Sequence, residues 1–208
     1  MRFAYADPPY LGRASYYEAH HEDAAIWDDP ETHRALIERL QAEYLDGWAL
    51  SLAPDNLAVI LPMCPSSAKV GAWISQHPRF GGNKATITRH FEPVIWCGGR
   101  PFSETGSRGA DYVITRHNPL PLHVNRYRVQ RKRIRNGEVF MGRKPRDFSM
   151  WMFRLLGAAS GDEFHDLFPG TGAVSAAWAE LCGMNPELPL TPLEAIAAGQ
   201  LEAARGRA

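Results

Sequence analysis

The feature that most constrains the fold is a short apolar strand that two prolines terminate near the start of the chain. Residues Phe3–Ala6 are apolar and of strand length, and Asp7-Pro8-Pro9-Tyr10 follows at once. Because proline has no N–H to donate and fixes its own φ, the strand has to end there and the chain has to turn. The turn displays a carboxylate and an aromatic ring at the carboxyl end of a strand, which is where open α/β sheets bind ligands.

A second motif lies near the other end of the chain. The strand-like segment Phe164–Phe168 leads into Pro169-Gly170-Thr171-Gly172, and Ala173–Leu181 has the pattern of a helix. Glycines permit a tight turn and a close approach of the backbone to a ligand. The free N–H groups at the start of the following helix attract negative charge. We therefore expect a nucleotide-type ligand here; an ordinary strand-to-helix turn is the alternative.

Between these motifs the sequence predicts alternating strands and helices. Asp29-Pro30-Glu31 combines an N-cap, a proline at the first helical position and an early acid, and predicts a helix over about 30–50. The continuous apolar run Leu57–Pro62 predicts a strand buried on both faces. A short helix is expected over about 67–76, followed by strands over Ala85–His90, Pro93–Cys97 and Tyr112–Thr115. This order favours an α/β sheet with helices on its faces.

Composition excludes several classes of protein. Apolar residues make up 45% of the 208 residues, which is enough for a core and excludes a disordered chain. The apolar run around Leu57–Met63 is far shorter than the roughly 20 residues that span a bilayer. The N-terminal residues have no apolar signal segment, so we expect a cytoplasmic protein without a membrane partner. Three cysteines without a CxxC spacing argue against a disulfide framework or a zinc site, and His20-His21 lacks a second ligand pair, so no metal is expected.

Basic residues gather in one stretch although the net charge is zero. Between 124 and 146, nine Lys and Arg residues stand against one acid, Glu138. Because Lys and Arg neutralise phosphates, this stretch is the expected contact with a nucleic acid, which the resemblance given below identifies as DNA. A solvated charged hairpin is the alternative. The DNA-binding residues predicted from this pattern are Arg126, Arg128, Arg131, Lys132, Arg133 and Arg135.

Together these motifs resemble a known family, the amino-methylating, S-adenosylmethionine-dependent DNA methyltransferases, and in particular the small adenine-N6 enzymes of phages and prophages. Ala6–Tyr10 (ADPPY) is similar to the catalytic motif, and Asp166–Val174 (DLFPGTGAV) is similar to the cofactor motif. Lys144-Pro145 with Phe148–Leu156 resembles the segment that precedes the cofactor motif, and Phe91–Trp96 resembles a pattern between the two. The order of the motifs is that of the β class. The resemblance therefore implies a three-layer, Rossmann-like methyltransferase sheet that is circularly permuted, with the catalytic motif N-terminal and the cofactor motif C-terminal.

The resemblance also implies roles for individual residues. Asp7, Pro8, Pro9 and Tyr10 are the expected catalytic residues, with the Asp7 carboxylate and the Pro8 carbonyl accepting from an amine and Tyr10 stacking on a flipped adenine. Tyr16-Tyr17 and His20-His21 are expected in a loop that closes over that base. The implied partner is DNA, in a bacterial or phage-infected cell. The expected contacts of the cofactor, S-adenosylmethionine (SAM), are Lys144, Pro145, Asp166, Phe168, Gly170 and Gly172.

For the domain organisation we expect a methyltransferase domain over 1–185 with a basic insert at about 108–146, and a tail over 186–208. Thr191-Pro192-Leu193-Glu194 predicts a short helix in that tail. Members of the family usually continue with a strand whose final acid holds the cofactor ribose, and no such strand follows Cys182. Either the sheet lacks an edge strand, or a second subunit supplies one in a homodimer.

Three other functions remain open at this point. Cytosine-N4 methylation is the nearest, although enzymes of that kind usually have Ser where this chain has Asp7. Adenine-N6 methylation of RNA is the second, and there Trp is usual in place of Tyr10. The third is a catalytically inactive DNA-binding module of the same fold.

Overall fold

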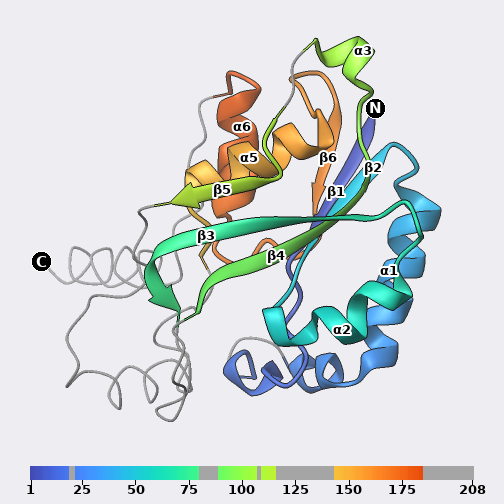
Figure 1. Ribbon diagram of the computed structural model, residues 1–208, viewed down its shortest axis with the longest axis vertical. Helices are drawn as coiled ribbons and strands as arrows, with labels where there is room; N and C mark the ends of the chain where they lie inside the picture. Colours follow the sequence, from blue (N-terminus) through green and yellow to red (C-terminus); the bar gives the residue numbers. More distant parts are fainter. Residues whose placement is uncertain (19–21, 80–88, 107–108, 116–142, 185–208) are drawn as a thin grey trace, which may run out of the picture.

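In the computed structural model of the protein, β1 (Arg2–Ala6) ends at the two prolines, as the sequence predicts. The structure describes residues 1–18, 22–79, 89–106, 109–115 and 143–184. The strands form a six-stranded sheet in the order β5-β3-β4-β2-β1-β6 (Figure 1). In this sheet β1 lies between β2 (Gly47–Ser51) and β6 (Glu163–Asp166) and runs parallel to both.

The other half of the sheet is mixed. The long strand β4 (Arg89–Gly98) is antiparallel to both of its neighbours, β2 and β3 (Lys69–Arg79). The edge strand β5 (Tyr112–Thr115) pairs in parallel with β3. Among the described residues, β6 forms the opposite edge of the sheet, and no strand continues beyond it there.

Helices cover the two faces of the sheet and make three layers (Figure 1). The helices α1 (Pro30–Glu43) and α2 (Leu57–Ile60) pack on one face, and α5 (Arg146–Leu156) and α6 (Ala173–Leu181) pack on the other. The short helix α3 (Phe102–Thr105) follows β4. Single 3₁₀ turns complete the connections, at Ala14–Tyr16, Ala24–Asp28, Pro54–Asn56 and Leu61–Met63.

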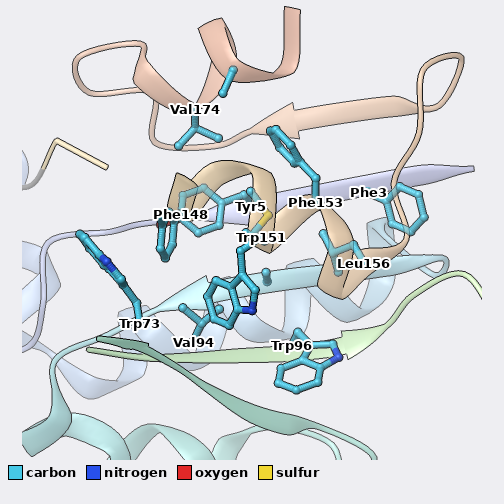
Figure 2. Packing of buried hydrophobic residues seen from close by; sticks show 13 residues of the cluster. Phe3, Tyr5, Trp73, Val94, Trp96, Phe148, Trp151, Phe153, Leu156 and Val174 are labelled. Atoms are coloured by element: carbon cyan, nitrogen blue, oxygen red, sulfur yellow. The ribbon is translucent and has the colours of Figure 1, made fainter. Parts of the chain in front are cut away.

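Side chains along β1 alternate between the two faces of the sheet and contribute to the hydrophobic core on each face. Phe3 and Tyr5 point toward α5 and α6, where Figure 2 shows them with Phe148 and Phe153. Ala4 and Ala6 face the opposite side and the apolar stripe of α1. Because β1 is buried on both faces and paired on both edges, the residues that follow it start from a rigid position.

The predicted helix over 30–50 is confirmed at its start but is too long. Asp29 is the N-cap of α1, and its carboxylate accepts from the backbone N–H of Glu31 at 3.0 Å. The helix ends at Glu43, and Trp48, which continues the helical spacing, lies in β2. Gly47 explains the break: its φ is +153°, and a Cβ there would lie 2.6 Å from the backbone N of Gly99. Only glycine permits this close approach of β2 to the end of β4.

Two other element predictions are wrong. The apolar run expected to be a strand over Leu57–Pro62 forms α2 and a 3₁₀ turn, with only Ile60 of α2 buried. The segment expected to be helical over about 67–76 forms β3 instead. Burial alternates there between one side chain and the next, with Trp73 and Ser75 buried, which is the period of a strand.

The other predicted elements that fall on described residues are found, whereas β2, α3 and α5 were not predicted as separate elements. The strands over Pro93–Cys97 and Tyr112–Thr115 and the helix Ala173–Leu181 are confirmed as β4, β5 and α6. The strand predicted over Phe164–Phe168 is β6, which begins and ends earlier, at Glu163 and Asp166. Most of the strand predicted over Ala85–His90 and the helix at Thr191 lie outside the described residues. Within the described residues, every helix is too short or too polar to cross a bilayer.

Candidate active site

Asp7 lies at the carboxyl end of β1, and the chain after it forms a closed turn. Pro8 and Pro9 are buried, and the backbone N–H of Arg13 donates to the carbonyl of Tyr10 at 2.8 Å. Asp28 ties the next residues down, because its Oδ1 accepts from the backbone N–H groups of Gly12 at 2.7 Å and Ala14 at 3.1 Å. The predicted catalytic residues are thus held on a rigid strand end.

Lys144 is the nearest charged partner of Asp7. Its Nζ donates to Asp7 Oδ2 at 2.6 Å, and the side chains of the two residues are 4% and 18% exposed. The ammonium also lies 5.6 Å, 5.7 Å and 5.8 Å from the ring centres of Trp73, Tyr10 and Phe148. Three aromatic faces attract and enclose the cation. Lys144, which the sequence predicts as a cofactor contact, therefore binds the carboxylate of Asp7.

The hydroxyl of Tyr10 joins two carboxylates. It lies 3.2 Å from Asp7 Oδ1 and 3.1 Å from Glu92 Oε2 on β4. Lys144 Nζ lies 3.4 Å from the same hydroxyl oxygen. Glu92 was not among the predicted site residues, although it lies in the Phe91–Trp96 pattern. An acid within the otherwise apolar run Phe91–Trp96 is the signal that could have found it.

Burial is the largest influence on the pKa values of Asp7 and Tyr10. It raises the pKa of Asp7, the ion pair and hydrogen bond with Lys144 oppose that increase, and the charge of Glu92 adds to it. Burial also raises the pKa of Tyr10 well above its ordinary value, with the charges of Asp7 and Glu92 contributing. Tyr10 therefore keeps its proton and acts as a hydrogen-bond donor to the carboxylates.

Asp166 lies at the end of β6, next to β1, and its Cα is paired with that of Tyr5. Ser175 Oγ of α6 donates to Asp166 Oδ2 at 2.9 Å. The other oxygen, Oδ1, is buried and has no hydrogen-bond partner in the part of the chain that the structure describes. Burial raises the pKa of Asp166 to about 6, the hydrogen bond from Ser175 opposes this, and the charge of Asp7 adds to it.

The turn after β6 requires its glycines. Gly170 has φ +50° and Gly172 has φ +72°, which is the left-handed region that favours glycine. The backbone N–H of Gly172 donates to the carbonyl of Pro169 at 2.6 Å. Gly172 is also the N-cap of α6, and no side chain caps that helix. The first N–H groups of α6 are left to other partners.

The two motifs line one small pocket. Asp7, Lys144 and Tyr17 line it together with the turn residues 168–171 and the exposed Arg143. Its volume of about 30 Å³ is room for one or two water molecules. Arg143, Pro169 and Gly170 are the exposed residues of its wall.

The structure brings some of the predicted site residues together and not others. Phe168 lines the pocket and also packs edge-on against Trp27, with ring centres 5.1 Å apart. Pro145 is the N-cap of α5 and is not among the pocket-lining residues. Tyr17, expected in a closing loop, lines the pocket, and His20-His21 lies outside the described residues, as do Arg126, Arg128, Arg131, Lys132, Arg133 and Arg135.

Comparison with known proteins supports the fold. No protein-family model matches the sequence, and no curated protein matches it. Among solved structures, the chain is similar to the crystal structure of the M1.HpyAVI–SAM complex, with a TM-score of 0.52 and 10% sequence identity. The similarity covers 88% of this chain and 78% of that one. The protein has the mixed α/β, Rossmann-like methyltransferase fold that the sequence predicts, with the strand that leads into Asp7 first in the chain.

Proposed function

We propose that the protein transfers a methyl group from SAM to the N6 amine of adenine in DNA. The observation that carries this proposal is the position of Asp7, a buried carboxylate at the end of β1, next to the strand that ends in Asp166. Both residues belong to motifs that the sequence resemblance assigns to methyl transfer. The similarity of the fold to a structure solved with SAM supports the same conclusion.

The residues around the glycine turn fit SAM. Its methionine part carries an ammonium and a carboxylate, and the unpartnered Oδ1 of Asp166 is an acceptor for the former. The uncapped start of α6 attracts the latter. Gly170 and Gly172 have no Cβ and leave the backbone open to a ligand. When bound, the cofactor supplies a methyl group activated by a sulfonium.

The catalytic turn fits an amine substrate. The N6 lone pair of adenine is delocalised into the ring, so it becomes nucleophilic only when acceptors hold the amine hydrogens. The Asp7 carboxylate and the Pro8 carbonyl are the acceptors that we assign to this role. Lys144 favours the ionised Asp7 that the role requires. The base has to leave the duplex to reach them, and stacking on Tyr10 contributes about 1–3 kcal/mol.

Replacing Asp7 tests the proposal. Asp7→Ala should abolish methylation of DNA, measured as transfer of a labelled methyl group, because the amine loses its acceptor. Calorimetry should show SAM affinity within about threefold of the wild type, equivalent to less than 1 kcal/mol. Asp111→Ala removes an exposed carboxylate in the same way and should change neither quantity. Near-normal turnover of Asp7→Ala would show that Asp7 is not a catalytic residue.

Mapping modified bases separates the alternatives. The protein is expressed in cells that lack adenine methylation, and methylated bases in their DNA and RNA are located by sequencing. We expect N6-methyladenine in DNA. N4-methylcytosine, or methylated adenine in RNA only, would assign the chain to one of the other two activities. A protein that binds DNA but not SAM would be an inactive module.

A further inference from the structure

The hydroxyl group of Tyr10 has one proton and two carboxylates within reach. Asp7 Oδ1 and Glu92 Oε2 lie at nearly equal distances from it, 3.2 Å and 3.1 Å. Lys144 Nζ, on the third side at 3.4 Å, carries only donors, so it directs the hydroxyl proton toward the carboxylates. Tyr10 therefore donates to one carboxylate at a time, and the two positions differ little in distance.

The other oxygen of Asp7 is not available to a substrate. Oδ2 accepts from Lys144 at 2.6 Å, and the Lys144 side chain is 4% exposed within its three aromatic rings. Moving this ammonium away would leave a buried carboxylate without its counter-ion, which is strongly unfavourable. Oδ1 is then the oxygen of Asp7 that can accept from an incoming amine, and the Tyr10 hydroxyl is its competitor.

We propose that Glu92 is a positioning residue that takes the hydrogen bond of the Tyr10 hydroxyl, so that Asp7 Oδ1 is free to accept from the substrate amine. This inference rests on the proposed amine methylation. In this arrangement Lys144 donates to Asp7 Oδ2 and the substrate amine donates to Asp7 Oδ1. The Tyr10 hydroxyl donates to Glu92, with the ring of Tyr10 in place for stacking. The hydroxyl of Tyr10 is moved from one carboxylate to the other without losing a hydrogen bond.

The proposal predicts that one substitution rescues another. Glu92→Leu leaves the Tyr10 hydroxyl with Asp7 as its acceptor in this cluster, and kcat for DNA methylation should fall by about tenfold, the scale of one hydrogen bond. Tyr10→Phe removes the competitor and keeps the stacking ring, so its rate is the reference against which the double variant is compared. The double variant Tyr10→Phe/Glu92→Leu should return to the rate of Tyr10→Phe. Glu92→Gln, which keeps an acceptor oxygen but not the charge, should fall between.

A structural role for Glu92 gives a different pattern. Loss of folding or of pocket shape in Glu92→Leu would not be repaired by Tyr10→Phe, so a double variant slower than either single variant would overturn the proposal. An unchanged rate in Glu92→Leu would overturn it as well. Circular dichroism and SAM affinity, measured on all four variants, show whether each one folds and binds the cofactor.

The pH dependence gives a second readout. Lys144, Tyr10 and Glu92 influence the protonation of Asp7 directly. Tyr5, Tyr17 and Arg143 line the same pocket as Asp7, and Asp166 lies on the neighbouring strand. The charge of Glu92 raises the pKa of Asp7, so Glu92→Gln should lower that pKa and move the acid limb of the methylation rate to lower pH. If the acid limb of the methylation rate stays at the same pH in Glu92→Gln, Glu92 does not act on Asp7.

The two proposals fail in distinguishable ways. If the wild-type protein binds SAM but methylates no nucleic acid, the proposed function is wrong. The carboxyl carbon resonance of ¹³C-labelled Asp7, assigned with Asp7→Asn, still reports the contact in that case. Its titration should move to lower pH in Glu92→Gln, and an unchanged titration would overturn the role of Glu92 independently of activity.

Discussion

Among the described residues, the buried cation of Lys144 contacts the Asp7 carboxylate, the Tyr10 hydroxyl and three aromatic rings. Lys144→Met keeps the length and packing of the side chain but leaves Asp7 buried without its counter-ion. We expect the free energy of unfolding to fall by about 3 kcal/mol, the lower end for breaking a buried ion pair. Urea denaturation at neutral pH measures this change.

A double-mutant cycle shows whether the loss comes from the pair. Asp7→Asn removes the charge that Lys144→Met leaves unpaired, so the double variant should be more stable than the sum of the two single effects predicts. Strictly additive losses would mean that Lys144 stabilises the protein through its aromatic neighbours and not through Asp7.

The raised pKa of Asp166 makes cofactor binding sensitive to pH. With a pKa of about 6, Asp166 is largely ionised at pH 7 and largely neutral at pH 5. An ammonium group binds the ionised form, so SAM affinity should fall about tenfold as the pH drops from 7 to 5. Calorimetry at several pH values measures this trend. In Asp166→Asn, which cannot ionise, the affinity should be low and nearly independent of pH; a decline that persists there would place the titrating group elsewhere.

At the scale of elements, the turn between β6 and α6 is set by glycine at two positive φ angles. Gly170→Val and Gly172→Val place a branched side chain in a conformation that costs about 1–2 kcal/mol for a residue with a Cβ. The side chain would also stand against the backbone that we assign to the cofactor. We expect SAM affinity to fall at least tenfold in a variant that still folds, measured by calorimetry beside thermal unfolding.

Gly161 is a control position that separates the effect of backbone strain from the effect of contact with the cofactor. Gly161 also has a positive φ, +98°, and a Cβ there meets nothing within 4 Å. Gly161→Val should therefore lower stability without changing SAM affinity. If Gly172→Val folds and binds SAM as the wild type does, the cofactor does not lie against this turn.

The elements predicted correctly are those whose signals are local. Prolines after Ala6, the N-cap at Asp29 and the glycines before α6 act within a few residues, so they can be read from the sequence. The apolar run of α2 and the segment of β3 were assigned to the wrong class because short apolar stretches suit both. Their class is decided by pairing with β4 and by packing on the sheet, which are contacts with distant residues.

The same distinction holds for the candidate site. Asp7, Tyr10 and Asp166 lie in motifs and were named from the sequence. The ion pair between Asp7 and Lys144, and the contact of Tyr10 with Glu92, join elements that are far apart in the chain. The motif predicts that Lys144 belongs to the site as a cofactor contact. Only the fold shows that its ammonium contacts Asp7.

At the scale of the whole molecule, the neutral net charge conceals the basic stretch between 124 and 146. We propose that this stretch binds DNA phosphates. Replacing Arg131, Lys132 and Arg133 by Gln should weaken binding to all sequences alike and flatten the log–log dependence of affinity on salt by about 2–3 units. An unchanged dependence of affinity on salt would mean that these residues are solvated and do not contact DNA. Loss of discrimination between sequences, with affinity retained, would instead indicate base contacts.

Two strands that are neighbours in the sheet, β1 and β6, come from opposite ends of the chain. During synthesis, β1 can pair with β2 soon after both are made, whereas residues 52–162 have to be made before β6 can pair with β1. Such distant pairings form late, because a long loop has to close before they gain any contact. A chain that stops before β6 therefore carries Asp7 without Asp166 and the glycine turn that follows it. Under the proposed function methyl transfer needs both motifs, so a chain that ends before β6 should transfer no methyl group.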